Sequence, residues 1–212
     1  MSNVLTQDEP LRLAVLVSGG GTTMVNLAQY IDQGELNATI EVVISSSANA
    51  KGVERAESRG YRTHVVDRKA YPTSEAMSEA IWPVIRDSNA DLVCMAGFLC
   101  LISIPQDFQN RVMNIHPSLL PSFGGKGMYG KRVHQAVLDA GCKVSGCTVH
   151  FANEEYDRGP IIVQRTCPVE DGDTADTLAS RVFEQECAAY PEAIRLFHAG
   201  RLNVEGGRVR AT

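Results

Sequence analysis

The feature that most constrains the fold is the alternation of short apolar runs with helix-like stretches along the first half of the chain. Strands are predicted at residues 11–17, 38–46, 62–67, 91–97 and 111–116, and helices at 22–32, 51–60 and 74–88. Strands that alternate with helices predict a parallel sheet with helices on both faces. The strands are rich in Val, Ile and Leu, which fits burial on both sides.

The pattern changes in the second half. A helix is predicted at 131–141 and a long helix at 173–200, with Asp173 as its N-cap. Between them, strands at 145–153 and 159–169 are separated by a short acidic turn, which is hairpin spacing. The sequence therefore predicts an α/β, single-domain, Rossmann-like three-layer sandwich, with a mostly parallel sheet and an antiparallel edge hairpin. Its domain spans residues 11–202, between an N-terminal lead-in (1–10) and a C-terminal tail (203–212).

Composition excludes several classes of protein. The chain has 212 residues and is 44% hydrophobic, which is typical of one globular domain. A formal net charge of −5 argues against sequence-independent nucleic-acid binding. The polar N-terminus does not resemble a signal peptide, and no apolar run is long enough for a membrane span. Six cysteines without a Cys-x-x-Cys pair predict a reducing, cytoplasmic compartment and no metal site.

A glycine-rich turn, "SGGGTT" (18–23), follows the first predicted strand. It fails the dinucleotide-binding pattern, because Met24 replaces the third glycine and the second strand ends without an acid. It also lacks the Gly-Lys-Ser/Thr of a P-loop. Two interpretations remain: the amides of Gly21, Thr22 and Thr23 bind a single phosphate at a helix N-terminus, or the glycines only pack helix against strand.

Polar residues of catalytic type lie at the end of the fifth predicted strand, in "MNIHPSLLPSFGGKG" (113–127). Asn114 and His116 are two apart and face the same side of the sheet, and Pro117 ends the strand. Ligands of parallel sheets bind at this edge. Asn can donate to an oxyanion, and His can transfer a proton near neutral pH. Taken alone, Asn114 and His116 could be a polar pair that caps the end of a strand. Asp157, in the turn between the two late strands, could likewise be a residue that only forms the turn.

Several segments together carry a family resemblance: "SGGGTT", "AGFLCLIS", "MNIHPSLLPSF", "GCTVHFANEEYDRGPII" and "EQECAAYPEAI". From Leu11 to Leu202 the chain resembles the glycinamide ribonucleotide formyltransferases of the folate-dependent formyltransferase superfamily. The resemblance implies the formyltransferase fold and an enzyme of de novo purine biosynthesis. Such an enzyme transfers the formyl group of 10-formyltetrahydrofolate to the amine of 5-phosphoribosylglycinamide, by direct amine attack and a tetrahedral intermediate, without a metal.

The resemblance also implies roles for three residues. Asn114 would donate to the oxyanion of the tetrahedral intermediate. His116 would assist the same charge and supply a proton to the leaving folate nitrogen. Asp157 would orient His116 or a bridging water and help to accept the amine proton.

Binding residues are implied in the same way. The ribonucleotide would contact Gly21, Thr22, Thr23 and Glu186, and His150 and Thr148 would support the site from the strand beneath. The implied folate contacts are Leu99, Cys100, Leu101, Ile102, Asn114, Asn153, Glu154, Glu155, Tyr156 and Asp157.

The chain departs from the family pattern at several positions. Thr23 stands where bacterial members commonly have Asn, Cys100 stands where Arg is frequent, and Ser74 lies near a position that some members fill with Arg. The loop at 124–134 is longer than usual. Its Lys126 either restores positive charge near a ligand or is a solvated loop lysine. His134, nearby, lies at the rim of the site or at the surface.

Other functions remain open at this stage. One alternative is formyltetrahydrofolate hydrolase, and another is a different amine formyltransferase. The short stretches before Leu11 and after Leu202 lead us to expect that the chain lacks the additional domains of the hydrolase and of methionyl-tRNA formyltransferase. A non-catalytic phosphosugar- or folate-binding module would not need Asn114, His116 and Asp157 together. The expected partners are small molecules, without nucleic acid or membrane, and the chain is expected to be a monomer or homodimer.

Overall fold

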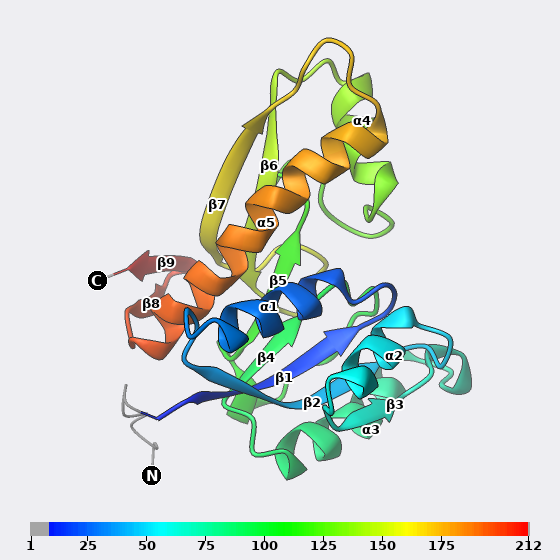
Figure 1. Cartoon of the computed structure of the whole chain (residues 1–212), viewed down its shortest axis with the longest axis vertical. Coiled ribbons are helices and arrows are strands. Elements are labelled where there is room, and N and C mark those ends of the chain that lie inside the picture. The colour runs from blue at the N-terminus through cyan, green and yellow to red at the C-terminus, as the bar shows by residue number, and fades with distance from the viewer. Residues whose placement is uncertain (1–8, 212) are drawn as a thin grey trace.

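The central element of the fold is a seven-stranded sheet with the order β3-β2-β1-β4-β5-β6-β7 (Figure 1). The computed structural model describes residues 9–211. Strands β1 to β5 pair in parallel, whereas β6 is antiparallel to both β5 and β7. The strands are β1 (Leu11–Val17), β2 (Ala38–Ser45), β3 (Thr63–Val65), β4 (Leu92–Met95), β5 (Val112–His116), β6 (Val144–Phe151) and β7 (Ile161–Pro168). The predicted mixed sheet with an antiparallel edge hairpin is confirmed.

Helices cover both faces of the sheet, as the sequence predicts. They are α1 (Thr22–Asp32), α2 (Lys51–Ser58), α3 (Ser74–Asp87), α4 (Lys131–Asp139) and α5 (Ala175–His198), with 3₁₀ turns η1 (Arg68–Ala70) and η2 (Gln106–Phe108). Alternate residues of β1 enter different cores. Leu13 packs in the core that includes Leu27 of α1 and Ile194 of α5, while Leu16 packs with Ile81 of α3. This alternation explains why β1 is apolar along its whole length.

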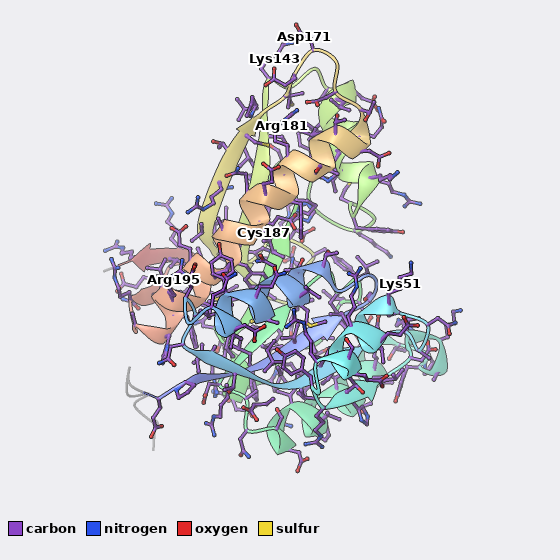
Figure 2. All side chains as sticks on the ribbon, in the orientation of Figure 1. Lys51, Lys143, Asp171, Arg181, Cys187 and Arg195 are labelled. Atoms are coloured by element: carbon purple, nitrogen blue, oxygen red, sulfur yellow. The ribbon has the colours of Figure 1, made fainter. Side chains whose placement is uncertain are left out.

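The start of α5 differs from the prediction. The helix begins at Ala175 and Thr174 is its N-cap, so the expectation that Asp173 is the N-cap is wrong. The Thr174 hydroxyl accepts the Thr177 amide at 3.2 Å and completes a capping box. The Asp173 carboxylate instead accepts from the Glu170 amide at 2.8 Å and from Arg181 at 2.6 Å; Figure 2 labels Arg181 on α5. Asp173 therefore closes the turn before the helix.

A hairpin occupies most of the stretch described from sequence as a C-terminal tail. It consists of β8 (Leu202–Glu205) and β9 (Arg208–Ala211) in a separate two-stranded sheet. Gly206 and Gly207 join the strands with φ of 56° and 75°. A two-residue turn with both φ values positive strongly favours glycine, so the Gly-Gly pair is the signal that sequence reasoning overlooked.

The long helix α5 is tied to the centre of the sheet by a buried hydroxyl. The Tyr190 ring is fully buried, and its hydroxyl lies 2.9 Å from the Met113 carbonyl and 3.2 Å from the Met95 carbonyl. These carbonyls belong to β5 and β4, next to the polar end of β5. Across residues 9–211, none of the helices combines the length and apolarity that crossing a membrane would need.

We expect the substitution Tyr190→Phe to lower the free energy of unfolding by about 1–2 kcal/mol, because two buried carbonyls lose their shared hydroxyl donor. Urea denaturation monitored by circular dichroism measures this change. Tyr129→Phe, at a half-exposed ring, serves as the matched control. Equal stability of the two variants would contradict the assigned role of the Tyr190 hydroxyl.

Candidate active site

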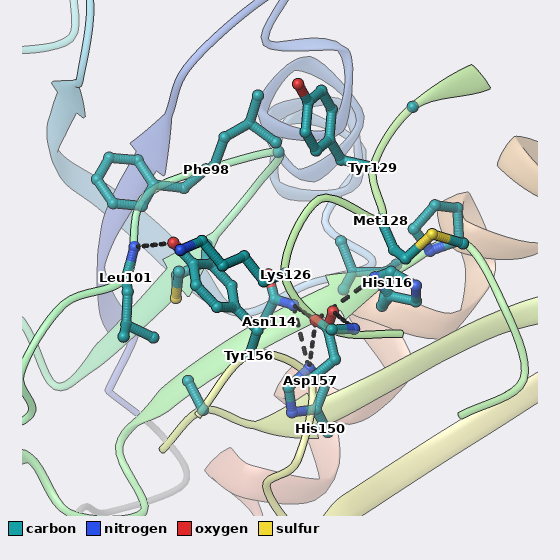
Figure 3. Close-up of a pocket in the computed structure, with 18 of the residues that line it drawn as sticks. Phe98, Leu101, Asn114, His116, Lys126, Met128, Tyr129, His150, Tyr156 and Asp157 are labelled. Carbon is teal, nitrogen blue, oxygen red and sulfur yellow. Dashed lines mark hydrogen bonds and ion pairs between the residues drawn. The ribbon is translucent and has the colours of Figure 1, made fainter. Parts of the chain in front are cut away.

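Asn114, His116 and Asp157 meet at the C-terminal end of β5 (Figure 3). Asn114 and His116 belong to β5, and Asp157 comes from the loop between β6 and β7. Asp157 Oδ1 lies 3.4 Å from His116 Nδ1 and 3.4 Å from Asn114 Nδ2. The side chains of His116 and Asp157 are 5% and 9% exposed. The structure thus brings together the three residues that the sequence identifies as catalytic candidates.

The position of Asp157 is fixed by close backbone packing. Its own φ is 57°, a left-handed conformation that non-glycine residues seldom adopt. The Gly125 amide donates to Asp157 Oδ2 at 2.8 Å. A Cβ atom on Gly159 would lie 1.7 Å from the Phe151 carbonyl oxygen, so only glycine lets the loop return to β6 at this point. The loop therefore holds the carboxylate against the end of β5.

The two nitrogens of His116 have different roles. Nε2 donates to the Phe123 carbonyl at 2.9 Å, which fixes the ring, and Nδ1 faces Asp157. Burial lowers the pKa of His116, and the Asp157 charge opposes that effect. Burial alone would raise the pKa of Asp157, but the contact with His150, the His116 charge and the Gly125 amide hold it below its ordinary value. Asp157 is therefore ionised at neutral pH, beside a ring nitrogen that can take up a proton.

The amide of Asn114 is oriented by His150 on the neighbouring strand β6. His150 Nδ1 donates to the Phe151 carbonyl at 2.9 Å, so its Nε2 accepts from Asn114 Nδ2 at 3.1 Å. The second N–H of Asn114 Nδ2 points to Asp157 Oδ1 over the longer distance of 3.4 Å. Long hydrogen bonds of this kind can shorten or exchange when a ligand binds. An incoming oxygen could therefore take over this N–H.

A second network shapes the loop that follows β5. Thr148 on β6 donates its hydroxyl to the Ser118 carbonyl at 2.7 Å and accepts the Leu120 amide at 3.0 Å. Gln164 on β7 donates to the Leu120 carbonyl at 3.0 Å. These contacts connect the loop to both antiparallel strands, which agrees with the expected supporting position of Thr148.

The polar cluster lies in the wall of a cavity of about 620 Å³. The Tyr156 hydroxyl accepts the Leu101 amide at 3.2 Å, which joins the β6–β7 loop to the segment after β4 (Figure 3). Nine of the ten implied folate contacts line this cavity: Leu99, Cys100, Leu101, Ile102, Asn114, Asn153, Glu155, Tyr156 and Asp157. Glu154 is exposed and does not line it.

The four implied ribonucleotide contacts do not all line one cavity. Thr23 and Glu186 line the same cavity, whereas Thr22 opens into a second cavity beside Arg55 and Gly21 lines neither. Gly21 has a φ of 68°, and a Cβ atom there would lie 2.7 Å from the Gly52 Cα. Close packing of α1 against α2 thus explains this glycine whether or not the loop also binds phosphate. Burial raises the pKa of Glu186 to about 7.

Several lining residues were not identified from the sequence. They come from the loop before α4 and from α4 and α5, and include Met128, Tyr129, Gly130, Arg132, Ala179 and Phe183. Lys126 and His134, each left with two interpretations above, also line the cavity. For the residues of the 124–134 loop, the unusual length of that loop was the sequence signal. Within residues 9–211, His, Cys, Asp and Glu side chains form no group of three that could hold a metal ion.

Comparison with known proteins identifies the class. The family model described as "Formyl transferase" matches residues 11–194, and the chain belongs to this family. Two relatives are similar to this chain over most of its length. A phosphoribosylglycinamide formyltransferase of Escherichia coli is 34% identical over 196 residues, covering 92% of this chain and 90% of the relative. The crystal structure of glycinamide ribonucleotide transformylase 1 from Symbiobacterium toebii has a TM-score of 0.90 and 42% identity, and the match covers 99% of this chain and 98% of that one.

A third relative is much longer. The "Trifunctional purine biosynthetic protein adenosine-3" of Gallus gallus is 39% identical over 206 residues, which is 96% of this chain. The chain spans only 20% of the length of that relative. The similarity therefore concerns one part of a multifunctional protein.

We expect Glu186 to make stability depend on pH. In the folded state the pKa of its carboxyl is about 7, whereas the ordinary pKa of a glutamate is 4.5. Between these values the folded state binds more protons than the unfolded state, so the free energy of unfolding falls as pH rises. Glu186→Gln removes this contribution, and the wild type should lose stability relative to the variant across this window.

Urea denaturation at intervals between about pH 4.5 and pH 8 measures the difference. Glu184→Gln, at an exposed position of the same helix, is the matched control and should follow the wild type. Parallel pH curves for the wild type and Glu186→Gln would contradict the raised pKa.

Proposed function

We propose that this chain transfers the formyl group of 10-formyltetrahydrofolate to the amine of 5-phosphoribosylglycinamide. One observation carries the proposal: a neutral amide, an imidazole and a carboxylate converge in the wall of a cavity that residues of both implied binding segments also line. Membership of the formyl transferase family and the names of the relatives support the same activity. The expected setting is the cytoplasm, and the chain is expected to act as a monomer or homodimer.

The geometry suggests how the residues act on the reacting atoms. Attack of the substrate amine on the formyl carbon places negative charge on the formyl oxygen. The N–H of Asn114 that makes the long contact with Asp157 can donate to this oxygen instead, while His150 keeps the amide oriented. The site supplies this donor already positioned, so little reorganisation is needed in the transition state.

Proton transfer involves the other two residues. The attacking amine must lose a proton, and the leaving folate nitrogen must gain one. His116 Nδ1 can hold a proton while Asp157 stabilises the imidazolium from 3.4 Å. Asp157, ionised at neutral pH, can also accept the amine proton directly or through a water. The two residues together can thus move the proton from nucleophile to leaving group.

Two groups of lining residues suit different substrates. The segment Leu99–Ile102 and the loop with Tyr156 offer apolar and aromatic surface, which suits the flat ring of a folate. Thr23 and Glu186 offer polar groups, which suit a sugar with its hydroxyl groups. Asn114 lies between Leu101 and Met128 in the view of Figure 3, and the formyl group would be transferred beside it.

Turnover in the presence of each substrate tests the proposal. We expect folate deformylation, followed by absorbance, only when both 10-formyltetrahydrofolate and 5-phosphoribosylglycinamide are present. Equal turnover in buffer without the ribonucleotide would indicate a hydrolase. Binding of the folate without turnover in either condition would indicate a binding module.

Asn114→Ala should lower kcat by about 10²–10³, because the transition state loses a positioned donor for its oxyanion. The KM for the folate should change much less, since this interaction strengthens only as charge develops. Steady-state kinetics at saturating ribonucleotide measure both constants. Asn49→Ala, at an exposed position away from the cavity, is the control. A normal kcat for Asn114→Ala would contradict the assigned role.

A further inference from the structure

The segment after β4 lines the cavity without belonging to a helix or a strand. Residues 99–102 are part of the cavity wall. Among residues 9–211, the backbone of 98–104 forms no hydrogen bond with another backbone group. Its hydrogen bonds come instead from four side chains: Ser18, Ser78, Trp82 and Tyr156. The shape of this part of the wall therefore depends on individual side chains rather than on pairing between strands.

Helix α3 holds one residue of the segment at two points. Ser78 Oγ accepts the Ser103 amide at 2.9 Å, and Trp82 Nε1 donates to the Ser103 carbonyl at 2.7 Å. Ser78 and Trp82 are four positions apart, so both lie on one face of the helix. This face satisfies both backbone groups of Ser103, as a neighbouring strand would in an antiparallel sheet.

The two side chains on α3 are themselves fixed. Ser78 is 2% exposed, and its hydroxyl donates to the Ser74 carbonyl at 2.7 Å, which leaves the oxygen free to accept the Ser103 amide. Trp82 is 5% exposed, and its ring centre lies 4.9 Å from that of Phe108. Neither Ser78 nor Trp82 lines the cavity. Both residues can therefore affect a ligand there only through the segment.

The contacts from α3 lie next to the part of the segment that a ligand would touch. Ser103 directly follows Ile102, which lines the cavity and also packs in the core that contains Ile81 of α3. At the other end of this stretch, Ser18 Oγ accepts the Leu99 amide at 2.9 Å. The cavity-lining stretch is thus held from both ends.

We propose that Ser78 and Trp82 are positioning residues, which hold segment 99–102 in the conformation that binds the folate. A segment without strand pairing would otherwise have to be ordered when the ligand binds, and that ordering would subtract from the affinity. The inference rests on the proposed function, in which residues 99–102 contact the folate. It adds two residues that lie outside the cavity.

Isothermal titration calorimetry with 10-formyltetrahydrofolate, in the absence of the ribonucleotide, measures the folate affinity without turnover. Ser78→Ala should raise the Kd by about 3- to 10-fold, because a hydrogen bond that preorganises the segment is lost. Ser78→Thr keeps a hydroxyl that can make both contacts and should restore most of the affinity. Trp82→Phe keeps a buried ring without the N–H donor and should also raise the Kd.

Steady-state kinetics add a second readout. For Ser78→Ala the KM for the folate should rise with the Kd, whereas kcat and the KM for the ribonucleotide should not change. A residue that contributes only to stability would not separate these constants. Melting temperatures are measured for all variants, and Trp82→Phe makes the same comparison if Ser78→Ala does not fold.

Ser88→Ala is the matched control. Ser88 lies at the C-terminal end of α3, is also buried, and donates its hydroxyl to the Ile85 carbonyl at 2.7 Å. Within the described part of the chain it forms no hydrogen bond with residues 98–104. Its loss should lower the melting temperature and leave the folate Kd unchanged.

An unchanged folate Kd in Ser78→Ala would overturn the inference. An equal rise in Ser88→Ala would also overturn it, since a general loss of stability would then explain both results. A wild type that binds the folate but shows no ribonucleotide-dependent turnover is a different result. It would overturn the proposed function, while the comparison of folate Kd values would still decide the positioning role.

Discussion

The antiparallel pairing of β6 with β5 is the interaction on which the site depends. The first five strands follow one another in parallel, and their C-terminal ends alone would offer Asn114 and His116 at an open edge. Because β6 runs back along β5, it places His150 opposite Asn114 and Thr148 opposite His116. The turn after β6 then returns Asp157 to the same edge. Asn114 thus gains a partner on a strand 36 residues later, and His116 faces a carboxylate from the loop that follows that strand.

Burial and charge are balanced within this cluster. Two imidazole rings and one carboxylate share a nearly water-free position, where an isolated charge would be costly. The Gly125 amide and the two rings stabilise the Asp157 carboxylate, and the Phe123 carbonyl keeps His116 in one orientation. The result is a group of buried side chains that their mutual contacts hold in place. Such preorganisation suits chemistry in which charge develops on one oxygen and a proton moves between two nitrogens.

Local patterns were enough to predict most of the architecture. The apolar runs identified the strands, and Gly60, with its φ of 77°, follows α2 as a helix-ending glycine should. The spacing of Asn114 and His116 placed both on one face because side chains alternate along a strand. The start of α5 was placed incorrectly because Asp173 and Thr174 are both good capping residues. Only the contacts of Asp173 with Arg181 and Glu170 decide between them.

By itself the sequence determined which chemical groups this protein has and in which order its strands and helices occur, because those depend on local composition and spacing. The family resemblance supplied Asp157 as the expected partner of His116, without the geometry of the pair. Only the tertiary structure decided that Asp157 faces His116 at 3.4 Å, that Glu154 lies outside the cavity and that His134 lies in its wall. These outcomes depend on the packing of α4 and α5 and on the return of the β6–β7 loop. Contacts between residues so distant in the sequence leave no local periodicity, so they exist only once the chain has folded.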